Sequence, residues 1–267
     1  MKMTNLASSS GGNCTYLEAG GKRVLIDLGI NCKQAVTRLD SIDVDPASVD
    51  AVFLTHEHSD HVNGLKVFCK KYHTPVYGTA LTLEAVLAGG RMEPLPEDLF
   101  CPIRADEPFH FGDLTIRPFG ISHDAADPVG YRFEAEGRAA AVATDLGTYT
   151  DYTVRNLQGA ELLLLESNHD LFLLETGSYT TRLKRRVMSC FGHLSNEQCA
   201  ALITRLLSDG NRFSGILLGH LSQENNREAL AYDTVCDYIT QSQVPYNGRE
   251  LPIFVAHRDA ISETIFC

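Results

Sequence analysis

Short apolar or alternating runs flanked by Gly, Pro and Asp recur along the chain, and this pattern predicts β-strands. These runs lie at 14–19, 23–29, 50–56, 74–79, 114–123, 130–136, 139–145, 160–167, 214–220 and 251–257. The helical candidates are 31–42, 63–73, 80–89, 149–158, 195–209 and 225–243. In the segment 195–209, Ser195 can cap the helix with Gln198 as its capping-box partner. We therefore expect two sheets covered by outer helices.

One stretch, 171–192, fits neither the strand nor the helix template and is expected to include a loop or lid. No linker, fixed-period repeat or low-complexity tract beyond SSSGG divides the chain. A chain of 267 residues is long enough to bury a large core. We expect one domain over 1–267, with two pseudo-halves at roughly 1–145 and 146–267.

Composition is ordinary for a globular protein, with 44% hydrophobic and 21% charged residues. No apolar run approaches the roughly 20 residues that a membrane helix needs. The polar N-terminus, MKMTNLASSSGGN, lacks the apolar segment of a secretory signal. The eight cysteines are widely spread with no CxxC pair, which is typical of free thiols in a reducing compartment. We expect a cytoplasmic protein with no membrane partner.

The net charge of −11 argues against a protein that coats nucleic acid with a basic surface. It leaves open a nuclease whose metal ions and local basic patch contact the phosphates. Charge alone therefore does not decide the substrate.

Several predicted strands end in a residue that can bind metal. VFLT runs into His56, GIS into His123, AVAT into Asp145, ILLG into His220, and RVLI into Asp27. Repeated His and Asp residues at strand ends place these side chains at one rim of the sheets, where sites are usually built.

The stretch THEHSDH, 55–61, concentrates metal-binding side chains directly after a strand. His56 and His58 are two positions apart, so on extended backbone they face one side and can share an ion. Asp60 and His61 follow where the chain turns and can face a second ion. Imidazoles favour zinc and similar metals, and a carboxylate can bridge two ions. A divalent metal gives a hydroxide nucleophile at neutral pH, so the pattern predicts a metal-dependent hydrolase.

The HxHxDH motif, together with ISH, ATD and LGH, resembles the metallo-β-lactamase superfamily across essentially the whole chain. The resemblance implies an α/β (α+β) fold, a four-layer αββα sandwich of two mixed β-sheets flanked by helices. It implies that one metal is held by His56, His58 and His123, and the other by Asp60, His61 and His220. Asp145 would bridge the two ions with a shared hydroxide, and Asp27 would orient a ligand. His61 and the bridging Asp disfavour antibiotic hydrolysis and favour the phosphodiesterase branch.

The sequence GHLS occurs twice, so either His193 or His220 could be the last metal ligand. His220 follows a strand, as the other candidate ligands do, and is assigned to metal. His193 precedes a helix and, together with Glu166 of LLLLES, is the candidate for proton transfer; Asp60 is included in the catalytic set. A purely structural role at the helix entry is the alternative for His193. The pattern of GHLS before the last ligand strand resembles tRNA-maturation endonucleases.

A narrower resemblance, to the YycJ/WalJ family, is carried by LASSSGGNCTYLEAGGKRVLIDLGIN, ESNHD, KRR, GHLSNE and GHLSQENN. It implies a bacterial DNA exonuclease that works from the 5′ end. SSSGGN could form a phosphate-binding nest, although a plain glycine-rich turn fits as well. The basic cluster of 171–192 could receive the nucleic-acid backbone or be a solvated face. The candidate substrate-binding residues are Ser9, Ser10, Asn13, His169, Arg182, Lys184, Arg185 and Arg186.

Two other functions remain open. One is a small-molecule phosphodiesterase, lactonase or thioesterase, with a lidded site that needs no basic cluster. The other is a regulatory metal-binding protein. Two divalent ions are expected in either hydrolase, with zinc favoured and manganese or iron compatible with His and Asp ligands.

Overall fold

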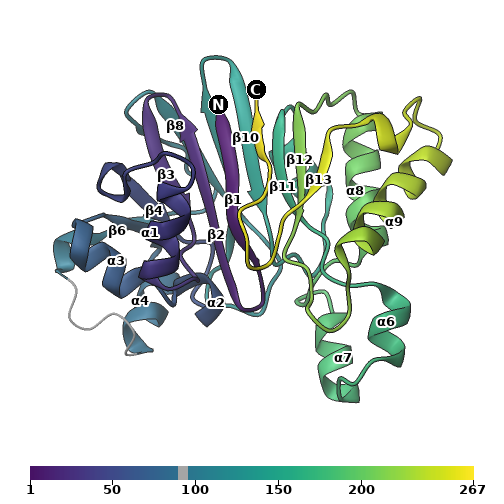
Figure 1. Cartoon of the computed structure of the whole chain (residues 1–267), viewed down its shortest axis with the longest axis horizontal. Helices are drawn as coiled ribbons and strands as arrows, with labels where there is room; N and C mark the ends of the chain where they lie inside the picture. The colour runs from purple at the N-terminus through teal and green to yellow at the C-terminus, as the bar shows by residue number, and fades with distance from the viewer. Residues whose placement is uncertain (90–95) are drawn as a thin grey trace.

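The computed structural model describes residues 1–89 and 96–267. Two mixed seven-stranded sheets pack face to face, and helices cover both outer faces (Figure 1). The first sheet has the order β14-β1-β2-β3-β4-β5-β6 and the second β13-β12-β11-β10-β9-β8-β7. This architecture confirms the predicted four-layer αββα sandwich.

The strands of the first sheet are β1 (Lys2–Ser9), β2 (Gly12–Ala19), β3 (Lys22–Ile26), β4 (Ala51–Phe53), β5 (Val76–Thr79), β6 (Phe100–Ile103) and β14 (Thr264–Phe266). Those of the second are β7 (Phe109–Phe111), β8 (Leu114–Gly120), β9 (Val129–Ala135), β10 (Arg138–Ala143), β11 (Leu162–Glu166), β12 (Gly215–Gly219) and β13 (Ile253–Val255). The chain passes from one sheet to the other between 103 and 109, earlier than the division near 145 expected from the sequence.

The helices of the described residues are α1 (Cys32–Asp40), α2 (Ser59–Val62), α3 (Leu65–Tyr72), α4 (Ala80–Ala88), α5 (Asp151–Leu157), α6 (Leu171–Thr176), α7 (Thr181–Val187), α8 (Asn196–Ser208) and α9 (Glu228–Gln241). Short 3₁₀ turns lie at Pro46–Ser48, Glu97–Leu99 and Gly248–Glu250. Within these ranges no helix is long and apolar enough to cross a membrane. The predicted capping box of Ser195 and Gln198 is present at α8.

Each sheet has an antiparallel half and a parallel half. Strands β3 to β6 and strands β10 to β13 run parallel, and helical crossovers join most of them, as parallel pairing requires. The interior strand β11, LLLLE, is buried at every position, which explains its continuous apolar sequence. The carboxyl ends of these parallel strands meet at one edge, where the site lies.

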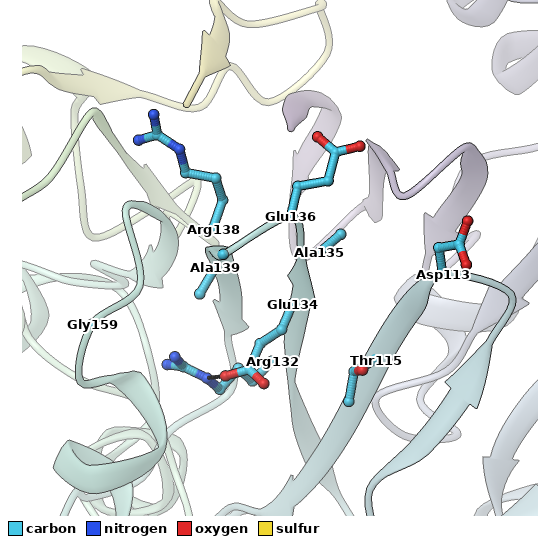
Figure 2. Close-up of a pocket in the computed structure, with 10 residues that line it drawn as sticks. Asp113, Thr115, Arg132, Glu134, Ala135, Glu136, Arg138, Ala139 and Gly159 are labelled. Carbon is cyan, nitrogen blue, oxygen red and sulfur yellow. Dashed lines mark hydrogen bonds and ion pairs between the residues drawn. The ribbon is translucent and has the colours of Figure 1, made fainter.

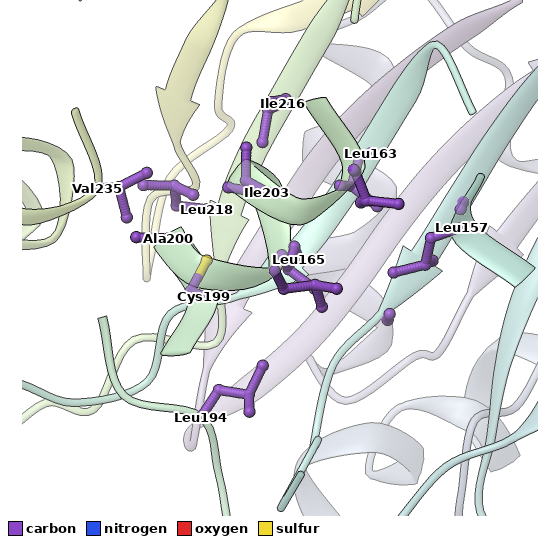
Figure 3. Close-up of a cluster of buried hydrophobic side chains, with 14 of the residues drawn as sticks. Leu157, Leu163, Leu165, Leu194, Cys199, Ala200, Ile203, Ile216, Leu218 and Val235 are labelled. Carbon is purple, nitrogen blue, oxygen red and sulfur yellow. The ribbon is translucent and has the colours of Figure 1, made fainter. Parts of the chain in front are cut away.

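Three apolar layers hold the sandwich together. The middle layer, between the sheets, is rich in aromatic rings, with Phe53 stacked on Tyr77 and edge-on to Tyr131. The outer layers lie under α1, α3 and α4 on one side and under α5, α8 and α9 on the other. In the second of these, Cys199, Ala200 and Ile203 of α8 face the leucines of the sheet (Figure 3).

The segment 171–192 is largely helical, which the sequence pattern did not predict. It contains α6 and α7, capped by the side chains of Asp170 and Thr180, and both helices project beside the lower end of the sheets in Figure 1. Strands β1, β6, β7 and β14 were also missed.

Candidate metal centre and active site

Five strand-end side chains predicted to form a site lie together at one edge of the two sheets. Asp27 follows β3, His56 follows β4, His123 follows β8, Asp145 follows β10 and His220 follows β12. Asp27, Asp145 and His220 have left-handed backbone, with φ of 58°, 58° and 55°. Such conformations are strained for residues other than glycine and cluster at functional sites.

The first candidate metal position is formed by His56, His58 and His123, whose nitrogen atoms lie within 4.8 Å of one another. His123 Nδ1 lies 3.2 Å from the carbonyl oxygen of Gly192, and donation to it leaves Nε2 free to face the group. His56 Nδ1 contacts Thr55 Oγ1, whereas its buried Nε2 has no hydrogen-bond partner among the described residues. An unpaired buried nitrogen is costly unless a ligand binds it.

The second candidate position is formed by Asp60, His61 and His220, which also lie within 4.8 Å of one another. Asp60 Oδ2 is 3.5 Å from His61 Nε2 and 3.6 Å from His220 Nε2. His220 Nε2 is buried and has no hydrogen-bond partner in the described structure. Each of the two positions therefore contains one buried imidazole nitrogen without a hydrogen-bond partner among the described residues.

Asp145 lies between the two positions. Its Oδ2 is 3.4 Å from His61 Nε2, and its Oδ1 is 3.4 Å from His220 Nε2 and 3.7 Å from His123 Nε2. Oδ2 is buried without a hydrogen bond from any described residue. A carboxylate in this place fits a role shared between two cations, and the donor set as a whole fits divalent metals.

Asp27 holds His61 in one tautomer. Its Oδ2 is 2.7 Å from His61 Nδ1 and accepts a second hydrogen bond from the Thr55 hydroxyl, while Oδ1 accepts from the Thr55 amide. The proton of His61 therefore sits on Nδ1, and Nε2 faces Asp60 and Asp145. The structure thus places Asp27 where it can orient a ligand.

Glu166 forms the corresponding support on the other side of the site. Its Oε1 is 2.8 Å from Nδ1 of both His193 and His220, and its Oε2 accepts from the amides of Leu146 and Leu194. The carboxylate is fully buried. It therefore fixes two imidazoles at once, which explains why both GHLS histidines lie at the site.

The charges of the site shift its pKa values strongly. Burial by itself raises the pKa of Asp60 and Asp145, but nearby imidazoles outweigh it and hold both pKa values below their usual range. Burial lowers the pKa of His220, but Asp145 and the other carboxylates raise it to about 10. Protons on these imidazoles occupy the positions that cations would take, so metal binding is expected to release protons.

Helix α2 carries Asp60 and His61 and is fixed by tight backbone packing against the loop after β3. Leu28 N donates to His61 O and Gly64 N donates to Leu28 O, each at 2.8 Å. A Cβ atom at Gly29 would lie 1.6 Å from the carbonyl oxygen of Asp60. Only glycine allows this approach, which explains the sequence DLG.

The candidate substrate residues near the N-terminus have different environments. Asn13 Nδ2 lies 3.3 Å from Asp60 Oδ2 and 3.0 Å from His61 Nε2, so this side chain reaches the site. The Asn13 side-chain oxygen accepts from the Ser9 amide, whereas Ser10 is exposed in the β1–β2 turn.

Another candidate substrate residue, His169, is buried, and this burial lowers its pKa to about 4. Its burial separates it from solvent in the described structure.

The four basic residues of the segment 171–192 also differ in their environments. Arg186 lines a cleft of about 440 Å³ together with His58, Asp60 and the end of α4. Lys184 Nζ donates to the carbonyl of Glu175 at the end of α6. Arg182 and Arg185 are exposed on α7. Of the four, only Arg186 lines this cleft.

Sequence reasoning missed residues that shape the site from its edges. Asp124 accepts two hydrogen bonds from Arg186 and has Oδ1 at 3.5 Å from His123 Nε2. Ser8 Oγ accepts from the amide of His220, and Asn168 donates to the His220 carbonyl. The sequence signals were the acid directly after ISH and the Asn within ESNHD.

A second hollow, of about 420 Å³, lies at the opposite end of the second sheet. It surrounds the start of β10 and includes Arg138, Glu136 and Asp113, with Arg132 paired to Glu134 (Figure 2). Because the strand-end ligands lie at the far end of β10, this hollow is remote from the metal-binding groups.

The sandwich and its two histidine-rich groups define the class of metallo-β-lactamase-fold hydrolases. Residues 22–209 match the family described as Beta-lactamase superfamily domain, and the chain belongs to this superfamily. It is 38% identical to exodeoxyribonuclease WalJ of Streptococcus pneumoniae over 91% of this chain and 90% of that protein. It is 35% identical to exodeoxyribonuclease YycJ of Bacillus anthracis, covering 88% of each.

The structure of the metallo-β-lactamase-fold protein YhfI from Bacillus subtilis matches with a TM-score of 0.70 and 16% identity. The match covers 98% of this chain and 99% of that one, and it shows the shared fold. These comparisons confirm the resemblance inferred from the motifs. The fold implies divalent metal ions, and the donor groups described above fit them.

Proposed function

We propose that this protein is a metal-dependent phosphodiesterase that removes nucleotides from the 5′ end of DNA. The observation that carries the proposal is the pair of candidate metal groups with Asp145 between them, opening on a cleft that also contains Arg186. The similarity to two exodeoxyribonucleases over about nine-tenths of each chain supports DNA as the substrate.

Two divalent ions would be held by His56, His58 and His123 and by Asp60, His61 and His220, with Asp145 shared. When bound, they supply Lewis acidity that activates water near neutral pH and stabilises negative charge on phosphate oxygens. The imidazole and carboxylate donors favour zinc, and manganese and iron are compatible with them.

The chain's own residues supply orientation and proton transfer. Donation from His193 Nδ1 to Glu166 leaves Nε2 of the partly exposed ring as the candidate to give a proton to the leaving oxygen. The centroid of the His193 imidazole ring is 5.2 Å from those of both His123 and His220, so the ring would lie beside a phosphate bound at the metal centre. Arg186, in the same cleft, would bind a phosphate oxygen.

The exposed cations of α7 favour a polyanion over a small ester. Arg182 and Arg185 add two exposed cations to the helix that carries Arg186, although the whole chain carries a net charge of −11. A small-molecule site would make no use of cations outside its cleft.

The test is cleavage of a single-stranded DNA oligonucleotide with a 5′ phosphate by protein stripped of metal and reloaded with zinc or manganese. We expect mononucleotides to appear from the first time point, starting at the 5′ end, and no products from the metal-free protein. An RNA oligonucleotide of the same sequence tests the preference for DNA. No cleavage by protein shown to hold two ions, or internal cuts only, would contradict the proposal.

Metal loading is expected to raise the melting temperature by about 10 °C. A ligand that binds the folded state at a thousand times its Kd stabilises by about 4 kcal/mol. In a chain of this size each kcal/mol shifts Tm by about 2–4 °C. Calorimetry with zinc or manganese, and with magnesium as a control that prefers oxygen ligands, measures the effect. An unchanged Tm with zinc and manganese would mean that the described donors do not hold the ions.

A further inference from the structure

An aromatic side chain stands exposed beside the candidate metal centre. Phe191 is 56% exposed, although a phenylalanine side chain gains about 1.5–3 kcal/mol when it is buried. The next residue, Gly192, has its carbonyl 3.2 Å from Nδ1 of His123, and His193 follows directly. Phe191 therefore lies two residues before His193 in the chain, and its neighbour Gly192 contacts His123.

The backbone that carries Phe191 is tightly fixed. The carbonyl of Phe191 accepts from the amide of Asp124 at 3.1 Å, and the carbonyl of Cys190 accepts from the hydroxyl of Ser122. A Cβ atom at Gly147 would lie 2.2 Å from the Cys190 carbonyl oxygen, so this contact is as close as glycine allows. The exposed ring thus projects from a rigid support, which reduces the entropy lost when it contacts a ligand.

Arg186 is linked to the backbone of Phe191 through Asp124. Its guanidinium donates to both carboxylate oxygens of Asp124, at 2.5 and 2.8 Å, while the Asp124 amide donates to Phe191. The pair with Asp124 uses two of the five guanidinium donors and leaves three for another anion. The guanidinium of Arg186 and the backbone of Phe191, whose ring is exposed, therefore both contact Asp124, which follows His123.

We propose that Phe191 stacks on the base of the nucleotide at the metal centre while Arg186 binds its phosphate, so that the enzyme takes single-stranded DNA ends. This inference rests on the proposed nuclease function. Inside a duplex both faces of a base are covered by its neighbours, so stacking on a side chain favours a base that has left the stack. A cationic group beside an aromatic ring is the usual combination in single-strand binding sites. The exposed Arg182 and Arg185 of the same segment complement the charge of the strand.

The test measures binding and cleavage separately, with metal-loaded full-length protein. Fluorescence anisotropy gives Kd for a 5′-phosphorylated single strand with phosphorothioate linkages, which resist cleavage, and for the same strand with abasic residues at its two 5′-terminal positions. Phe191→Ala is expected to weaken binding of the normal strand about tenfold, because one base–aromatic stack is lost, and to leave binding of the abasic strand unchanged. Phe191→Tyr should restore binding. Phe266→Ala, which removes a ring that is 61% exposed on β14, is the matched control and should change neither.

The other outcomes are distinguishable. Equal weakening of both strands by Phe191→Ala would indicate a structural role and overturn the inference, as would no weakening of either. A dimer of the wild type that Phe191→Ala converts to monomer would show that the ring contacts a second copy, and would also overturn it. Cleavage by the wild type is scored on its own. Its absence contradicts the nuclease proposal, whereas the binding ratios still decide whether Phe191 recognises a base.

Discussion

Asp145→Asn is expected to lower kcat/KM for DNA cleavage by roughly 10³-fold, equivalent to about 4 kcal/mol of transition-state stabilisation. The Asp145 oxygens lie 3.4 Å from His61 Nε2 and from His220 Nε2, on the two sides of the site. An amide keeps the shape of the side chain but removes the negative charge that two cations would share. Its NH₂ group would also face imidazole nitrogens that need to point at metal.

Three measurements separate this effect from misfolding. Metal content should fall below two ions for each chain, kcat should drop, and the far-UV circular dichroism spectrum should stay unchanged. Asp113→Asn makes the same chemical change at an exposed position in the remote hollow and should preserve both ions and full activity. Wild-type activity in Asp145→Asn would contradict the placement of Asp145 between the metals.

The strands that were predicted from the sequence are those in which the buried positions are occupied by apolar residues. Strand β1 was missed because Thr4, Asn5 and Ser8 are polar and yet buried. Thr4 bonds to Thr264, Asn5 donates to Thr15, and Ser8 accepts from the amide of His220. Each of these side chains forms a hydrogen bond with a residue on another strand or loop, and such partners are known only once the sheet has formed.

His56, Asp145 and His220 were predictable for the opposite reason, since each follows an apolar strand with a parallel partner and parallel strands share one edge. Helices α6 and α7 were not predicted, because several large apolar side chains of the segment 171–192, such as Phe172 and Phe191, are exposed. A segment without a buried apolar stripe has no helical periodicity to detect. The contact of Phe191 with Asp124 joins segments about 70 residues apart and required the folded chain.

Glu166 shows how one buried side chain can decide the chemistry of two others. It accepts hydrogen bonds from Nδ1 of His193 and His220, which turns both Nε2 atoms toward the site, where that of His220 can act as a ligand and that of His193 can transfer a proton. Its second oxygen accepts from the amides of Leu146 and Leu194. All four partners are donors, and only a carboxylate can accept from all of them.

Glu166→Gln is therefore expected to fold well but to fail at metal binding. The Gln oxygen can accept from Leu146 and Leu194, and its NH₂ group can donate to both imidazoles only if each carries its proton on Nε2. That tautomer blocks the atom of His220 that faces Asp60, and loss of such support typically costs about 10–100-fold in metal affinity. Because two imidazoles are affected, we expect kcat/KM to fall about 10³-fold.

Glu166→Ala should behave differently, since it leaves buried donors without acceptors at about 1–3 kcal/mol each and lowers Tm as well. Glu136→Gln, at an exposed position, is the control for the chemical change. Competition with a chelator measures metal affinity, and ¹⁵N chemical shifts of the imidazoles report the tautomer directly. If Glu166→Gln kept normal metal affinity with protons still on Nδ1, Glu166 would not set the tautomer, and His193 would lose its support as the group that transfers the proton.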